Sequence, residues 1–146
     1  MQINLGIIMK PKYQTAHMRA AHLYAGLSTA RRLKVGALVV KDDRIISIGY
    51  NGMPSGWDNN CELELEDGTI KTKPEVLHAE MNSLMKLARS NESGLDASMF
   101  ITHSPCIDCA KGIYQAGIKE VYYANEYRDT AGIEFLQKCG VLVKKI

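Results

Sequence analysis

Two short segments of this 146-residue chain carry residue types that bind metals and move protons: His-Ala-Glu at 78–80 and Pro-Cys-Ile-Asp-Cys at 105–109. Cysteines at i and i+3 share one face of a first helical turn, where the unpaired N–H groups of a helix N-terminus stabilise thiolates. One imidazole and two thiolates give zinc three protein ligands and leave a fourth position open, which is typical of a catalytic site. The sequence therefore predicts that His78, Cys106 and Cys109 bind a catalytic zinc ion.

Glu80 lies two residues after the histidine, so its carboxylate can approach a zinc-bound water without displacing a ligand. Zinc lowers the pKa of such a water to roughly 7, which supplies a hydroxide nucleophile. Glu80 would take the proton, deliver it to ring N3 of a nucleobase and then help to expel ammonia. The pattern H-x-E followed by P-C-x-x-C is the known signature of zinc nucleobase deaminases, and this chain contains both parts in that order. We therefore predict that Glu80 is the catalytic acid–base residue.

Each motif alone is weak evidence. A C-x-x-C pair also fits a redox pair or a structural zinc knuckle, and a His-x-Glu pair is common on exposed helices. Their order, with each at a predicted helix start, argues against coincidence. The main rival is a structural zinc site with Cys61 or Cys139 as fourth ligand. Cys139 precedes Gly140 near the C-terminus and is expected to pack as a small apolar side chain. Cys61 lies in a long loop, and the sequence does not exclude it as a fourth ligand.

The remaining histidines are given structural roles. We expect His17 and His22 to be ordinary residues of a first helix, at the surface or partly buried. His103 ends a predicted strand beside the second motif, and we expect it to support the pocket without binding the metal.

Composition and charge limit the classes of function. With 46% hydrophobic and 23% charged residues, the chain is predicted to be a single globular domain over 1–146. The net charge of +2 is too small to indicate a nucleic-acid surface. The longest apolar stretches are strand-sized, and no signal peptide is evident, so we expect a cytoplasmic protein without a membrane partner. In that compartment a C-x-x-C pair indicates metal or redox chemistry rather than a disulfide.

The elements that must position these motifs alternate along the chain. Helices are predicted over 10–33, 78–91, 106–117 and 130–139, and strands over 35–40, 44–50, 99–102, 120–124 and 141–145. Lys41-Asp-Asp predicts a hairpin turn between the first two strands. The segment 51–76 is predicted to be irregular, and either functional or mobile. Gly94, Gly117 and Gly140 are expected in left-handed caps after helices. The expected fold is an α/β three-layer sandwich, a five-stranded mixed sheet with helices on both faces.

The residues around both motifs resemble the cytidine deaminase superfamily, and within it the deoxycytidylate deaminase branch, including phage-encoded members. The resemblance covers about residues 31–143. It rests on R-L-K-V-G-A at 32–37, G-Y-N-G-M-P-S-G at 49–56, H-A-E-M-N at 78–82, T-H-S-P-C-I-D-C at 102–109, and Tyr-Arg at 127–128. It implies the cytidine deaminase-like fold and hydrolytic deamination of deoxycytidine monophosphate (dCMP) to dUMP and ammonia, which supplies the precursor for thymidylate synthesis.

The resemblance also implies how the base and sugar bind. Asn51 would bond to the sugar hydroxyl, the backbone N–H of Ala79 to the pyrimidine O2, and the carbonyl of Ser104 would accept from the amino group. For Asn51 a turn role is the alternative, because Asn-Gly is a strong turn signal.

For the 5′-phosphate the resemblance implies Arg128, with Tyr127 and Arg32. A guanidinium suits this ligand because its paired N–H donors match two phosphate oxygens. The alternative for Tyr127 and Arg128 is a solvated loop with one packed aromatic ring.

Members of the branch are typically homohexamers, activated by dCTP and inhibited by dTTP, each with magnesium. Some members carry a second, structural zinc, for which no clear ligand set is evident in this sequence. If the gene is carried by a phage, the enzyme is expected in the host cytoplasm.

Other functions compete with this interpretation. A transfer-RNA adenosine deaminase shares the zinc motif and first hairpin, but the long, acidic connection over 52–77 disfavours a polynucleotide. A free-cytidine deaminase has no need of Arg128, and a riboflavin-pathway deaminase is usually joined to a reductase domain. A non-catalytic zinc-scaffolded binding module remains an alternative, but it gives no reason for Glu80.

Overall fold

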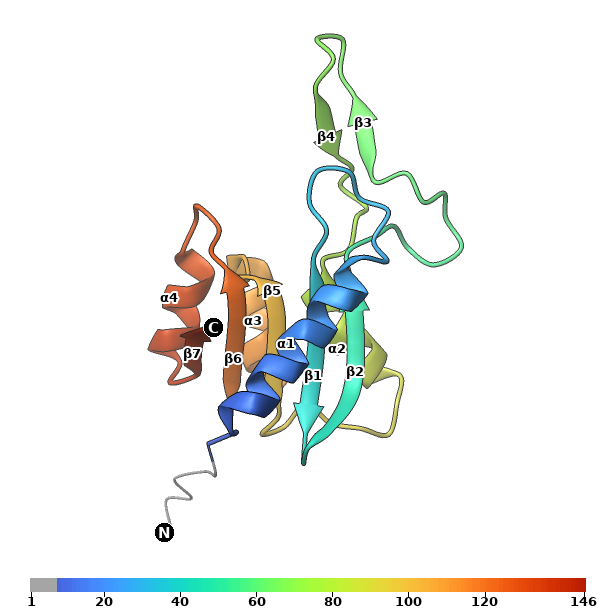
Figure 1. The fold of residues 1–146 in the computed structure, drawn as a ribbon. Helices are drawn as coiled ribbons and strands as arrows, with labels where there is room; N and C mark the ends of the chain where they lie inside the picture. The colour runs from blue at the N-terminus through green and yellow to red at the C-terminus, as the bar shows by residue number, and fades with distance from the viewer. Residues whose placement is uncertain (1–7) are drawn as a thin grey trace.

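A five-stranded mixed sheet forms the centre of the computed structural model, which describes residues 8–146 (Figure 1). Its strands, in the order β2-β1-β5-β6-β7, are β2 (Arg44–Tyr50), β1 (Gly36–Lys41), β5 (Ser98–His103), β6 (Glu120–Asn125) and β7 (Leu142–Lys145). β1 runs antiparallel to both of its neighbours, and β5, β6 and β7 are mutually parallel. The predicted mixed sheet is therefore confirmed.

Helices cover both faces of the sheet, as predicted (Figure 1). They are α1 (Pro11–Ala25), α2 (Ala79–Ala88), α3 (Ile107–Gln115) and α4 (Ala131–Lys138). On one face, Met18 and Ala21 of α1 pack with Leu38, Phe100 and Tyr122 of the strands. The larger core cluster lies on the other face, between the sheet and the helices α2, α3 and α4. Within residues 8–146, no helix is both long and apolar enough to cross a bilayer.

The first helix is shorter than predicted, since it ends at Ala25 rather than at residue 33. Leu23 and Leu27, which suggested a longer apolar face, are 76% and 58% exposed. Beyond the helix, the chain forms hydrogen bonds with residues that are distant in sequence. The Ser28 hydroxyl, for example, donates to the carbonyl of Asn51. Residues 28–34 are therefore a loop, whose partners lie far along the sequence.

Two of the three glycine predictions are confirmed. Gly117 and Gly140 follow α3 and α4 with φ of 87° and 80°, the left-handed region. The prediction of a left-handed cap at Gly94 is wrong, because α2 already ends at Ala88 and Gly94 does not have a positive φ. The turn between β1 and β2 is a two-residue turn in which Asp42 and Asp43 both have positive φ.

The segment predicted to be irregular contains a hairpin, which projects beyond the end of the sheet (Figure 1). β3 (Glu62–Glu64) pairs antiparallel with β4 (Ile70–Thr72) in a separate two-stranded sheet. Gly68 closes the turn with a φ of 85°, and its N–H donates to the carbonyl of Leu65. The prediction missed this hairpin because both strands are three residues long and β3 is rich in glutamate, which is depleted in strands.

Candidate active site

Two helix N-termini bring the three predicted metal ligands together. His78 is the N-cap residue of α2 and Cys106 that of α3, both in extended backbone conformation. The Cys106 sulfur accepts from the Cys109 N–H, which fixes the C-x-x-C pair on the first turn of α3. His78 Nδ1 lies 3.6 Å from Cys106 Sγ and 3.3 Å from Cys109 Sγ.

These distances fit a zinc ion. With Zn–N of about 2.1 Å and Zn–S of about 2.3 Å, tetrahedral ligands N and S lie about 3.6 Å apart. The three ligand atoms lie within 4.8 Å of one another, and across residues 8–146 no other His, Cys, Asp or Glu joins a group of this kind. Cys61 and Cys139 are both outside it. Cys139 instead packs against the core, as predicted.

One of the two thiols is already in the form that binds a metal. The pKa of Cys106 is lowered to about 4, because the Cys109 side chain, the His78 ring and the Cys109 backbone N–H all hydrogen-bond to its sulfur. Cys109 shares this cluster, and its own pKa is raised by the interaction with Cys106 and by burial. The hydrogen bond to Cys106 raises the pKa of His78. Cys106 is therefore a thiolate at neutral pH, the form that ligates zinc.

Glu80 lies on the first turn of α2 and is only 4% exposed. Burial raises its pKa to about 7, which suits a group that must both accept and donate a proton near neutral pH. Gly49 of β2 allows this placement, since a Cβ there would collide with the carbonyl of Ala79. The Asn82 amide donates to the carbonyl of Tyr50 and ties the same turn to β2 at 2.8 Å.

A cavity of about 770 Å³ opens over these residues. It is lined by Ala30, Arg32, Leu33, Val35, Asn51, Thr72, His78, Ala79, Glu80, Cys106, Tyr127, Arg128 and Asp129. Five of the six predicted substrate residues are in this lining. The exception is Ser104, which is fully buried behind the wall and whose hydroxyl accepts from the backbone N–H of Tyr127 at 2.9 Å.

Asn51 joins the end of β2 to the chain that leads into β1. Its Oδ1 accepts from the Val35 N–H at 2.8 Å, and its Nδ2 donates to the Leu33 carbonyl at 2.8 Å. An amide oxygen has a second lone pair and an NH₂ group has a second hydrogen, so each end can still meet a ligand. Asn51 is thus held rigidly at the cavity by the backbone.

Tyr127 and Arg128 also line the cavity, and they lie in the loop between β6 and α4. The Tyr127 ring packs on His103 with centroids 5.4 Å apart, and desolvation raises the pKa of Tyr127 to about 12. His103 therefore lies behind the wall and outside the metal group. Among residues 8–146, Arg128 makes no ion pair or side-chain hydrogen bond, so its guanidinium is free to bind an anion.

Sequence reasoning missed five lining residues: Ala30, Leu33, Val35, Thr72 and Asp129. Thr72 comes from the hairpin, which no motif indicated. Asp129 carried a usable signal, because an aspartate shortly before a helix is a common cap. Its Oδ1 accepts from the Ala131 N–H at 2.9 Å, where α4 begins.

Comparison with known proteins agrees with this geometry. Residues 11–125 match the family model for the cytidine and deoxycytidylate deaminase zinc-binding region. ComE operon protein 2 of Bacillus subtilis is 40% identical over 134 residues, covering 88% of this chain and 68% of that protein. The deoxycytidylate deaminase of Enterobacteria phage T4 is 33% identical over 147 residues, covering 75% of this chain and 76% of that protein. The crystal structure of dCMP deaminase from cyanophage S-TIM5 in complex with dCMP and dUMP is 53% identical, with a TM-score of 0.88, and covers 94% of this chain and 99% of that one.

Proposed function

This chain belongs to the cytidine and deoxycytidylate deaminase family, and from that premise we propose that it catalyses the hydrolytic deamination of dCMP to dUMP and ammonia. One observation carries the proposal: a single cavity is lined by two of the metal ligands, by Glu80 and by two arginines, Arg32 and Arg128. The similar cyanophage enzyme was crystallised with both dCMP and dUMP. A product of this kind would serve as the precursor for thymidylate synthesis.

The chemistry follows from the residues at the base of the cavity. His78, Cys106 and Cys109 would hold a zinc ion, which would supply Lewis-acid activation of a water molecule. Glu80 takes a proton from the attacking water and delivers it to ring N3 as the oxygen bonds to C4. Glu80 then takes the remaining proton from the C4 hydroxyl and passes it to the amino group, so that the C4=O bond forms, the C4–N bond breaks and ammonia leaves. A carboxyl with a pKa near 7 can perform both transfers.

Backbone groups orient the pyrimidine. The Ala79 N–H is at the first position of α2, where helix N–H groups have no partner inside the helix. It can therefore donate to the pyrimidine O2. We assign the Ser104 carbonyl to the exocyclic amino group and the Asn51 amide to the sugar hydroxyl, in line with the family resemblance.

The phosphate is assigned to the outer part of the cavity. Arg128 and Arg32 both line the cavity, and Tyr127 is next to Arg128 in the sequence. Paired guanidinium donors match the oxygens of a phosphate better than a single ammonium group does. A free nucleoside would leave both arginines without a ligand, which is why a nucleotide substrate is proposed.

We also propose that the enzyme is a cytoplasmic homohexamer, activated by dCTP and inhibited by dTTP with magnesium. The family resemblance supports this, as does an apolar groove of about 440 Å³ between α2 and α3, lined in part by Met81, Met85 and Gly112. Met85 is 51% exposed on that groove, where a second copy would cover it. Sedimentation velocity with and without dCTP tests the assembly, and a monomer under all conditions would contradict it.

A substrate panel tests the proposed reaction. Ammonia release is measured with cytosine, cytidine, deoxycytidine, dCMP and a transfer-RNA stem-loop, and zinc content is measured on the same sample. We expect one catalytic zinc per chain and the highest kcat/KM for dCMP. Zinc binding without ammonia release from any substrate would support the non-catalytic binding module instead.

A further inference from the structure

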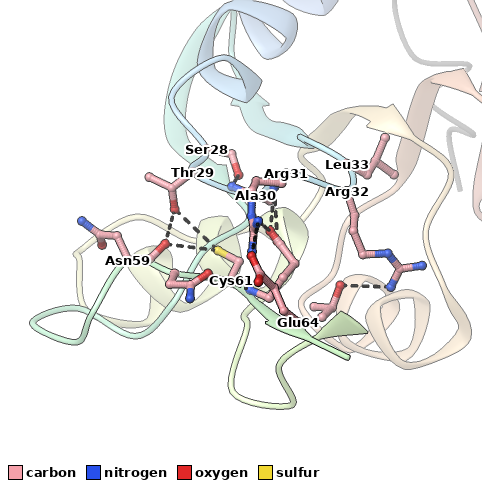
Figure 2. Close-up of polar contacts among 12 residues, drawn as sticks. Ser28, Thr29, Ala30, Arg31, Arg32, Leu33, Asn59, Cys61 and Glu64 are labelled. Atoms are coloured by element: carbon pink, nitrogen blue, oxygen red, sulfur yellow. Dashed lines mark hydrogen bonds and ion pairs between the residues drawn. The ribbon is translucent and has the colours of Figure 1, made fainter. Parts of the chain in front are cut away.

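The β3–β4 hairpin contacts the loop at 28–34, which forms one wall of the cavity (Figure 2). Thr29 donates to the carbonyl of Asn59 at 2.6 Å and lies 3.5 Å from the Cys61 sulfur. Further along the same loop, Arg31 reaches Glu64 of β3 (Figure 2). Ala30, Arg32 and Leu33 of this loop line the cavity. The hairpin is therefore placed to set the position of that wall.

Glu62 is the buried group at this contact. Its side chain is 1% exposed, and its two oxygens accept from the Arg31 backbone N–H at 2.6 and 3.2 Å. The Arg31 Nε lies 3.9 Å away on a side chain that is 47% exposed. A carboxylate is costly to bury unless it is paired and hydrogen-bonded, so this one is tightly specified by its surroundings. Nothing in the proposed reaction uses it.

The register of the hairpin explains what Glu62 can do. Glu62 and Thr72 are direct partners across β3 and β4, so their side chains lie on the same face. The Thr72 hydroxyl accepts a hydrogen bond from Arg32 Nη1 at 3.2 Å. Arg32 directly follows Arg31, whose backbone N–H donates to Glu62. One face of the hairpin thus holds two successive loop residues, Arg31 by its backbone and Arg32 by its guanidinium.

We propose that Glu62 is a positioning residue for substrate: through the Arg31 N–H it fixes the loop at 28–34, so that Thr72 can aim Arg32 at the 5′-phosphate. A guanidinium has five N–H donors, and the contact with Thr72 uses one, which leaves the rest for phosphate oxygens. The inference rests on the proposed dCMP deaminase function and deepens it, because it assigns part of the nucleotide specificity to the hairpin.

The test measures kcat and KM for dCMP and for deoxycytidine, with zinc content as a check on each variant. Glu62→Ala should raise KM for dCMP about 10-fold or more, the effect of losing one hydrogen bond to a charged group, while kcat changes less than about three-fold. KM for deoxycytidine should not change. Glu62→Gln keeps one acceptor oxygen and should restore much of the loss. Glu64→Gln is the matched control, since this glutamate also faces Arg31 but is 75% exposed, and it should behave as wild type.

A double-mutant cycle separates positioning from a general effect on the fold. If Glu62 acts through Arg32, then Glu62→Ala should add little to the KM of an Arg32→Ala variant. Thr72→Val should raise KM for dCMP alone, and it serves as an independent variant if Glu62→Ala does not fold.

Two results would overturn the inference. The first is an equal change in KM for both substrates, or a fall in kcat alone, in Glu62→Ala or, should that not fold, in Thr72→Val. The second is full additivity with Arg32→Ala. A failure of the proposed function itself is visible without any variant, because wild-type protein would then show no preference for dCMP over deoxycytidine.

Discussion

Replacing Glu80 by glutamine should remove catalysis and leave the metal site intact. The variant keeps the three ligands and nearly the same side-chain volume, but it cannot carry a proton from water to N3. General acid–base catalysis contributes roughly 10²–10⁴-fold, and Glu80 serves two transfers, so kcat should fall at least by that range. Zinc content should equal that of wild type.

The same substitution should stabilise the metal-free protein at high pH. Burial raises the Glu80 pKa from its ordinary 4.5 to about 7, so the folded state holds this proton more tightly than the unfolded chain. Wild type therefore loses stability as the pH rises from about 4.5 to 7, by about 3 kcal/mol at about 1.4 kcal/mol per pH unit. Glutamine does not ionise and escapes this loss. Bound zinc opposes the effect, because a nearby cation favours the carboxylate.

Chemical denaturation of zinc-free wild type and Glu80→Gln at pH 5 and pH 8 measures this difference, with ammonia release on the zinc-loaded proteins alongside. We expect similar stabilities at pH 5 and a more stable variant at pH 8. Turnover within a few-fold of wild type would refute the catalytic role. A variant less stable than wild type at pH 8 would refute the account of its buried charge.

Three further outcomes are expected. Metal analysis should show that Cys106→Ala and Cys109→Ala lose zinc. Cys61→Ala and Cys139→Ala should keep it, since Cys61 and Cys139 lie outside the metal group. Zinc loss in Cys61→Ala would instead support a structural zinc site. Arg128→Ala should lower kcat/KM for dCMP by roughly 10- to 150-fold, which corresponds to the loss of about 1.5–3 kcal/mol, and should lower kcat/KM for deoxycytidine much less. Lys34→Ala is the control and should have a smaller effect. An equal loss for both substrates would show that the phosphate binds to other residues. Gly132→Ala should destabilise the protein by about 1–3 kcal/mol in thermal unfolding and weaken zinc binding, because the new Cβ would collide with the Pro105 carbonyl beside Cys106. Unchanged zinc affinity would show that α4 does not fix the position of Cys106.

The metal site could be predicted because its signals are local. Cys106 and Cys109 share one helical turn, and His78 and Glu80 share another, so the spacing within each short motif indicates how its side chains lie relative to each other. The main sheet was predictable for a similar reason, since each strand is a β-branched or aromatic run bounded by turn residues. The Asp42–Asp43 turn shows the same agreement between local sequence and structure.

The rest depended on contacts between distant residues. The loop at 28–34 follows a helical pattern, but Ser28 and Arg31 bond to residues beyond position 50, which no local pattern reveals. Thr72 reaches the cavity only because the acidic hairpin folds back on that loop. Lys71 and Lys73 flank Thr72 in the sequence but are absent from the cavity lining.

The pairing of β1 with β5 has a consequence for the order in which the molecule assembles. Ala37 lies opposite Ile101 at the middle of the sheet, although β2, the hairpin and α2 all intervene along the chain. Closing so long a loop is slow compared with forming the β1–β2 hairpin, which needs only a two-residue turn. His78 precedes β5 and the two cysteines follow it, so the three ligands converge only after β5 has docked. We therefore expect zinc capture to be a late event in folding, which requires both thiols to stay reduced until the central strand is in place.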